Sequence, residues 1–366
     1  MVSVVPVTTF AISLRRARAA VPIVLVAILV TATLVTAPTG AVSAAAGCDP
    51  ATAGQDVNWS RGLIGAPEAW HAGYTGKGVK VAVLDTGYDQ QHSDLGGRVV
   101  AAKDFTGSRD GTRDTDGHGT HVASTVAGSG AGSNGCYRGV APEADLLIGK
   151  VLDGTNPDFT VTVIAGMEWA VASGARVVNL SLGTHHPTDG NDPLSQAVTR
   201  LSAATGALFV VSSGNMSSYV EGPGSAALSV GSVDRNRVVA PISTGGPRVG
   251  DNALKPEVTA PGEKVVAARA HGVREPIPDN PLYTMDSGTS MAAPHVAGAA
   301  AILAQAHPEW RAPQLKAALI GSATPAPDTH VYRPGRLAGG GRPAHLRPGT
   351  VGGARHPLPV RPVERG

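Results

Sequence analysis

Short runs of consecutive apolar residues alternate along the chain with longer stretches in which apolar positions recur every three or four residues. The apolar runs predict buried strands at residues 81–87, 146–151, 176–182, 207–213 and 227–233. The stretches with helical spacing predict helices at 63–70, 120–127, 161–173, 192–205 and 312–320, and a small-residue apolar helix follows Ser290. Because strands alternate with helices, we expect an α/β fold of three layers: a doubly wound, mostly parallel sheet with helices on both faces.

The two ends of the chain depart from this pattern. Arg15, Arg16 and Arg18 precede an apolar segment at 21–35, and small residues follow, which predicts a cleaved secretion signal over residues 1–46. A membrane anchor is the alternative, because the apolar segment is long. The remainder divides into a short polar lead at 47–61, a folded domain at 62–323 and a Pro-, Gly- and Arg-rich tail at 324–366, which is predicted to be disordered.

Composition narrows the function classes. The formal net charge is +2 for 366 residues, so the fold as a whole has no electrostatic preference for nucleic acid. Two cysteines, Cys48 and Cys136, are too few for a disulfide framework. Three states remain open for Cys48: a disulfide with Cys136, a free thiol, and acylation as a lipoprotein, since Ala45-Ala-Gly-Cys48 loosely resembles a lipobox. Without acylation we expect a secreted monomer with no stable membrane association.

Three polar side chains interrupt the apolar pattern where strands end and helices begin. Asp85 closes the first strand, His118 lies between two glycines before a helix, and Ser290 lies at a helix start, where backbone N–H groups and the positive dipole end face outward. Pro294 is expected in the first turn of that helix, where its missing N–H costs nothing. Each polar residue has an ordinary explanation: Ser290 and Asp85 as caps, and His118 as half of a metal pair with His121. Together, in the order Asp, His and Ser, they predict a nucleophile, its base and the acid that orients the base.

The sequence motifs around these three residues resemble those of the subtilisin-like serine proteases, or subtilases. The matching motifs are Val83-Leu-Asp-Thr-Gly87, His118-Gly-Thr-His-Val122 and Gly288-Thr-Ser-Met-Ala-Ala-Pro-His295. The resemblance covers residues 63 to 323, so we interpret 62–323 as a subtilisin-like peptidase domain. It implies a secreted serine endopeptidase that hydrolyses polypeptides through an acyl-enzyme intermediate, with Asp85, His118 and Ser290 as catalytic residues.

The same resemblance implies further site residues. Asn215 follows Gly214 at the end of a strand and matches the family's oxyanion asparagine, although an ordinary turn is the alternative explanation. Ser181, Leu182 and Gly183 resemble the strand edge that pairs with an extended substrate backbone. Because Gly183 and Gly214 leave space beside this edge, we expect them to admit large apolar side chains of the substrate.

Calcium is the cofactor that the resemblance suggests, and no other is expected. Asp94 holds the position at which family members often ligate calcium. A hard cation needs several oxygen ligands, and the others are expected from the loop at 129–138. The alternative is that Asp94 caps a turn.

Two other functions compete with an active protease. A binding or surface protein without catalytic activity could keep the fold. The presence of Asp85, His118, Ser290 and Asn215 argues against a loss of activity through replacement of catalytic residues. An esterase or acyl-transferring enzyme would use the same residues, and a panel of peptide and ester substrates would distinguish it.

Overall fold

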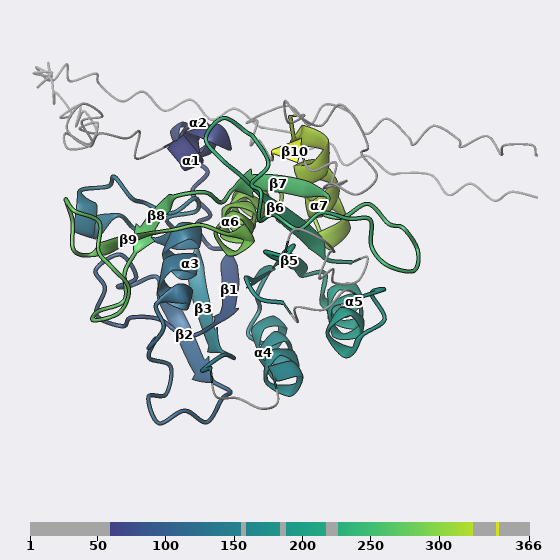
Figure 1. Ribbon diagram of the computed structural model, residues 1–366, viewed down its shortest axis with the longest axis horizontal. Coiled ribbons are helices and arrows are strands. Elements are labelled where there is room, and N and C mark those ends of the chain that lie inside the picture. The colour runs from purple at the N-terminus through teal and green to yellow at the C-terminus, as the bar shows by residue number, and fades with distance from the viewer. Residues whose placement is uncertain (1–58, 155–158, 184–187, 217–225, 325–341, 344–366) are drawn as a thin grey trace, which may run out of the picture. The chain divides into compact units, whose positions relative to one another are not determined.

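The computed structural model describes residues 59–154, 159–183, 188–216, 226–324 and 342–343 (Figure 1). The chain divides into a unit at Met1–Ser43 and a unit at Ala44–Gly366, and the described residues all belong to the second. The predicted secretion signal lies outside the described residues. Within the described part of the chain, no helix combines the length and apolar character needed to cross a bilayer.

One parallel sheet forms the centre of the described domain (Figure 1). Its strands follow the order β10-β7-β6-β5-β4-β1-β3-β2, and each neighbouring pair is parallel. The strands are β1 (Lys80–Asp85), β2 (Val99–Asp104), β3 (Asp145–Lys150), β4 (Val177–Leu180), β5 (Leu208–Ser212), β6 (Leu228–Val233), β7 (Val258–Pro261) and β10 (Arg342–Pro343). A separate antiparallel pair consists of β8 (Val265–Ala268) and β9 (Tyr283–Asp286). All five strands predicted from apolar runs are present, as β1, β3, β4, β5 and β6.

Helices cover both faces of the sheet, which confirms the predicted three-layer fold. They are α1 (Trp59–Leu63), α2 (Ala66–His71), α3 (His118–Ala127), α4 (Phe159–Ala172), α5 (Pro193–Thr205), α6 (Thr289–Ala306) and α7 (Ala312–Ser322). Successive side chains of β1 point to opposite faces. Val81 and Val83 pack in one core with α3, α6 and α7, whereas Ala82 and Leu84 pack in the other core with α4 and α5.

The helix that carries Ser290 crosses the centre of the sheet. α6 packs against β4, β5, β6 and β7 and against α3. Its small side chains allow this closeness: a Cβ added at Gly298 would lie 2.6 Å from the Cβ of Val140. The run of Ala residues predicted after Ser290 is therefore a close-packed core helix that fixes where the Ser290 backbone lies.

The structure shows contacts at both ends of the predicted domain that the sequence did not indicate. Ser60 and Arg61, assigned to a polar lead at 47–61, are buried in α1, where Arg61 donates to the carbonyls of Arg138 and Val266. Arg342–Pro343, assigned to a disordered tail, pairs with β7 as strand β10. Neither contact is local in sequence, so composition could not indicate it.

Cys136 is disulfide-bonded. The only other cysteine in the sequence is Cys48, which lies outside the described residues. The three states considered for Cys48 therefore concern a residue outside the described part of the chain.

Candidate active site

The residues predicted to act on a substrate meet at the carboxyl edge of the sheet, where ligands bind in open α/β folds. A cavity of about 780 Å³ opens there. Its lining includes most of the predicted site residues: His118, Ser181, Leu182, Gly183, Gly214, Asn215 and Ser290. Asp85 lies behind His118 and is fully buried at the end of β1.

A short hydrogen bond joins the predicted acid to the predicted base. The Nδ1 atom of His118 lies 2.7 Å from Oδ1 of Asp85, which also accepts from the backbone N–H of Thr86. Two glycines permit this approach: a Cβ at Gly119 would lie 2.2 Å from the carbonyl oxygen of Gly87. The start of α3 therefore lies directly against the end of β1. The glycines around His118 indicated that a close backbone contact was possible, but they did not indicate which segment it would involve.

The environment of His118 raises the pKa of its imidazole above the ordinary 6.5. Burial of the ring is the largest single influence and lowers the pKa, because it disfavours the charged form. The negative charge of Asp85 and its hydrogen bond to the ring act in the opposite direction and together outweigh burial. The ring keeps 19% of its side chain exposed, on the side of the cavity.

Ser290 is the second residue of α6, as predicted, and it is half-buried at the cavity wall. Its hydroxyl donates to the carbonyl oxygen of Ser181 at 3.2 Å. The predicted place of Pro294 in the first turn is wrong, because it is the sixth residue of α6 and lies inside the helix. Proline cannot donate to the carbonyl of Ser290, and the hydroxyl of Ser181 donates to that carbonyl instead, at 2.8 Å.

The amide of Asn215 is oriented by the residue before Ser290. The backbone N–H and the hydroxyl of Thr289 both donate to Asn215 Oδ1, each at 3.0 Å, and the Thr289 hydroxyl also accepts from the N–H of Gly214. With Oδ1 engaged, the Nδ2 group is the donor that Asn215 has to offer. A Cβ at Gly288 would lie 3.3 Å from Nδ2, so glycine keeps this approach open.

The predicted substrate edge borders the same cavity. Ser181, Leu182 and Gly183 continue directly from β4, and Leu152 and Phe159 add apolar surface to the lining. Ser181 is held in place because its hydroxyl accepts from Asn179 Nδ2 at 3.0 Å. The edge is therefore anchored by a hydrogen bond at Ser181 and borders the cavity along its length.

The residues around Asp94 do not fit a calcium ion, contrary to the expectation from the resemblance. Asp94 is fully buried, with Oδ1 accepting from the N–H of Gly132 and Oδ2 accepting from the hydroxyl of Tyr283 at 2.8 Å. The loop at 129–138, which was expected to supply oxygen ligands, thus turns the N–H group of Gly132 toward Asp94. Positive charge comes from buried Arg61, whose pKa burial lowers to about 10 and whose charged form Asp94 favours. Across the described residues, no cluster of His, Cys, Asp and Glu is arranged to hold a metal.

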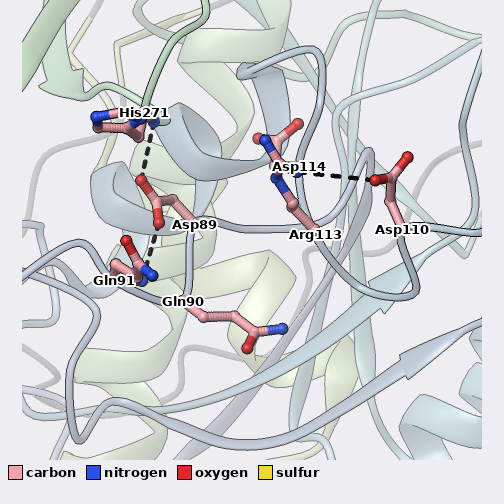
Figure 2. Close-up of a pocket in the computed structure, with 7 residues that line it drawn as sticks. All are labelled: Asp89, Gln90, Gln91, Asp110, Arg113, Asp114 and His271. Carbon is pink, nitrogen blue, oxygen red and sulfur yellow. Dashed lines mark hydrogen bonds and ion pairs between the residues drawn. The ribbon is translucent and has the colours of Figure 1, made fainter.

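A second hollow of about 450 Å³ is lined by acidic side chains beside the Asp89 turn (Figure 2). Its carboxylates already have donors. Asp89 accepts from the N–H groups of Gln91 and His271, and Asp114 accepts from Thr86, Gly117 and Thr120 at the start of α3. These bonds make the cluster a structural cap for α3 and an anchor for the segment at His271.

His121, considered above as the metal partner of His118, and His295 are both fully buried packing residues. His121 contacts the carbonyl of Val265 and His295 that of Met291. Burial lowers their pKa values to about 4 and about 3. Both rings are therefore neutral at ordinary pH and do not compete with His118 as a base.

Three residues of the site were not singled out by sequence reasoning. Thr86 accepts from the N–H of Gly119 and joins β1 to α3, and Thr289 orients Asn215. Each directly follows or precedes a predicted catalytic residue, which is a signal that could have found it. Arg274, which also lines the cavity, lies in a segment without helical or strand periodicity, so no pattern in the sequence indicated it.

Similarity to known proteins identifies the class of this α/β protein as a hydrolase of the serine class. Residues 76–338 match the subtilase family. An alkaline protease of Alkalihalobacillus alcalophilus is 38% identical over 292 residues, covering 78% of this chain and 69% of that protein. Subtilisin Savinase of Lederbergia lenta is 38% identical over 289 residues, covering 77% of this chain and 96% of that protein.

The major intracellular serine protease of Bacillus subtilis strain 168 is also 38% identical, over 259 residues that cover 66% of this chain and 73% of that protein. A crystal structure of a cold-adapted subtilisin-like serine proteinase matches with a TM-score of 0.58 and 30% identity, covering 72% of this chain and 89% of that chain. The chain belongs to the subtilase family and is a subtilisin-like serine endopeptidase.

Proposed function

We propose that the chain hydrolyses polypeptides with Ser290 as nucleophile, His118 as general base and then general acid, and Asp85 as the carboxylate that orients the imidazole. The observation that supports this most directly is the 2.7 Å contact between His118 Nδ1 and Asp85, with the exposed side of the ring and Ser290 lining the same cavity. A hydrogen bond to the Asp85 carboxylate favours the tautomer with its proton on Nδ1, which leaves Nε2 free to accept one.

The reaction follows from this arrangement. The Ser290 hydroxyl turns from the Ser181 carbonyl, passes its proton to His118 Nε2, and attacks the carbonyl carbon of the scissile peptide. The resulting imidazolium is stabilised by Asp85 and gives its proton to the departing amine, which leaves an acyl-enzyme ester on Ser290. Water then attacks the ester with His118 again as base, and the free serine is restored.

Asn215 supplies one donor for the oxyanion in this proposal, and the N–H of Ser290 at the start of α6 supplies the other. The orientation of Asn215 by Thr289 supports the role, because its donor is fixed before the substrate arrives. Such preorganised donors stabilise charge that develops only in the transition state.

Replacing Asn215 by Leu is expected to lower kcat by about 10²- to 10³-fold with little change in KM, a range measured in a subtilisin for the loss of one such donor. Leu keeps the side-chain size but cannot donate. Steady-state kinetics on a chromogenic peptide would measure the effect. A kcat close to that of the wild type would show that Asn215 is an ordinary turn residue.

The proposal as a whole is tested by hydrolysis of casein and of a peptide amide over a pH series. Because neutral His118 is the active form and its pKa is raised, we expect kcat/KM to rise with pH through a value above 6.5 and then to level off. Absence of hydrolysis by a folded protein, at any pH of the series, would contradict the proposed function.

The segment at 1–46 supports secretion, and we propose an extracellular enzyme that acts on polypeptides as a monomer. Expression of the full-length chain with a C-terminal tag would test this. The tagged protein is expected in the culture medium, shortened at its N-terminus, and retention of residues 1–46 in a membrane fraction would instead favour the anchor.

A further inference from the structure

One arginine joins the two chain segments that carry His118 and Ser290. The Arg274 guanidinium donates through Nε to the carbonyl of Asp116 at 3.1 Å and through Nη2 to Asp116 Oδ1 at 2.8 Å, and Nη1 donates to Asp286 Oδ2. Asp116 lies two residues before His118, and Asp286 lies four residues before Ser290. A planar guanidinium holds such partners at a fixed spacing, which a flexible ammonium does not.

Asp116 connects Arg274 to His118, the proposed base. Its Oδ1 accepts from the backbone N–H of His118 at 3.1 Å. The intervening Gly117 has φ +95°, and a Cβ there would lie 3.1 Å from Cδ of Arg274. The arginine stem therefore packs on the turn that leads into α3, and the guanidinium fixes the carboxylate at its tip.

The segment between β8 and β9 holds Arg274 in a conformation that the residue does not prefer. Its φ is 57°, in the left-handed region that non-glycine residues disfavour because Cβ approaches the following carbonyl oxygen. Neighbouring contacts keep it there: Asp89 accepts from the N–H of His271 (Figure 2), and Arg269 donates to the carbonyl of Arg274. Such backbone strain tends to persist where function requires a particular geometry.

We propose that Arg274 is a positioning residue whose guanidinium, bonded to Asp116 and Asp286 at once, sets the spacing between the His118 imidazole and the Ser290 hydroxyl. The inference rests on the proposed catalytic roles of His118 and Ser290. Arg274 itself is 30% exposed and lines the cavity, but the role assigned to it acts through the two carboxylates.

The charge of Arg274 also reaches His118 and lowers the pKa of the imidazole. The charged and titratable groups around the ring come from three elements, namely Asp85 from β1, Asp116 and His121 from α3 and the turn before it, and Arg274 and Asp286 from the β8–β9 segment. Removing the guanidinium leaves the carboxylates of Asp116 and Asp286 without their cation. Both changes favour the imidazolium, so the acid limb of the activity profile should move to higher pH.

The test compares Arg274→Ala and Arg274→Lys with the wild type. For Arg274→Ala we expect kcat to fall about 10- to 100-fold with KM nearly unchanged, because a small displacement of reacting groups is costly. Its acid limb should move to higher pH, and added guanidinium ion below denaturing concentrations should restore part of kcat. Arg274→Lys keeps the positive charge but lacks the planar guanidinium that can bond both carboxylates at a fixed spacing. Its kcat should therefore still fall, while the acid limb of its pH profile should move less than that of Arg274→Ala.

Arg176→Ala is the matched control, because the Arg176 guanidinium also joins distant parts of the chain, donating to the backbone carbonyls of Pro308 and Trp310, but does not line the cavity. It should lower the melting temperature and leave the acid limb in place. A limb that moves equally in Arg176→Ala would mean that the shift follows from lost stability and would overturn the specific role of Arg274.

Failure of the inference can be told from failure of the proposed function. A folded wild-type protein that neither cleaves peptide nor reacts at Ser290 with a serine-directed reagent overturns both. An active wild type with an Arg274→Ala variant that keeps kcat within about threefold and an unmoved acid limb overturns the inference alone. Should Arg274→Ala not fold, a wild-type kcat in Arg274→Lys overturns it in the same way.

Discussion

Replacing Ser290 by Ala is expected to lower kcat for peptide hydrolysis by about 10⁶-fold, the size of loss found for the nucleophile of a subtilisin. Without the hydroxyl no acyl-enzyme forms, and His118 has no nucleophile from which to accept a proton. The residual rate over water, about 10³- to 10⁴-fold, would come from oxyanion donors and substrate binding. Stopped or discontinuous assays on a peptide amide, with enzyme in excess, reach this range.

The control for Ser290→Ala is its stability. The variant loses one hydrogen bond, to the Ser181 carbonyl, which is worth about 1 kcal/mol, so its melting temperature should change by only a few degrees. Alanine is also a good helix former. Wild-type protein should take up one equivalent of a serine-directed inhibitor at Ser290 and the variant none. Substantial peptide hydrolysis by the variant would show that the nucleophile lies elsewhere.

The change Asp85→Asn is expected to lower kcat by about 10⁴-fold, as the corresponding change does in serine proteases. Asp85 Oδ1 accepts the Nδ1 proton of His118 and is held by the Thr86 N–H. An amide at this place can donate to Nδ1 instead, so the ring would carry its proton on Nε2 and could not accept one from Ser290. Peptide hydrolysis at the pH plateau of the wild type would measure the loss.

Asp104→Asn is a matched control for Asp85→Asn. Asp104 also lies at the carboxyl end of a strand of the sheet, but its oxygen bonds only within its own turn, to Thr106. That variant should keep kcat within about twofold of the wild type. If Asp85→Asn were equally active, the short contact with His118 would be structural only, and the proposed mechanism would need another orienting group.

Much of the candidate site could be predicted because its chemically active residues lie in short sequence motifs. Asp85, His118 and Ser290 each lie at the end of a strand or the start of a helix, and such positions are visible in the apolar pattern on either side of them. The exposed edge strand β2 and the short strand β7 were not predicted, since neither is a long apolar run.

The calcium site predicted at Asp94 was not found because a local motif does not show which groups surround a residue in the fold. The motif named the carboxylate, but its donors Gly132 and Tyr283 come from other parts of the chain.

By itself, the sequence determined the α/β layers, the family and the identity of the predicted catalytic groups, because hydrophobic periodicity and local motifs depend only on near neighbours in the chain. Only the tertiary structure decided which of those groups meet, what occupies the second oxygen of Asp94, and that Arg274 spans Asp116 and Asp286. The bond from Arg274 to Asp116 joins residues 158 positions apart. Contacts of that separation, and the pKa shifts they produce, arise from how the layers pack, which no local pattern records.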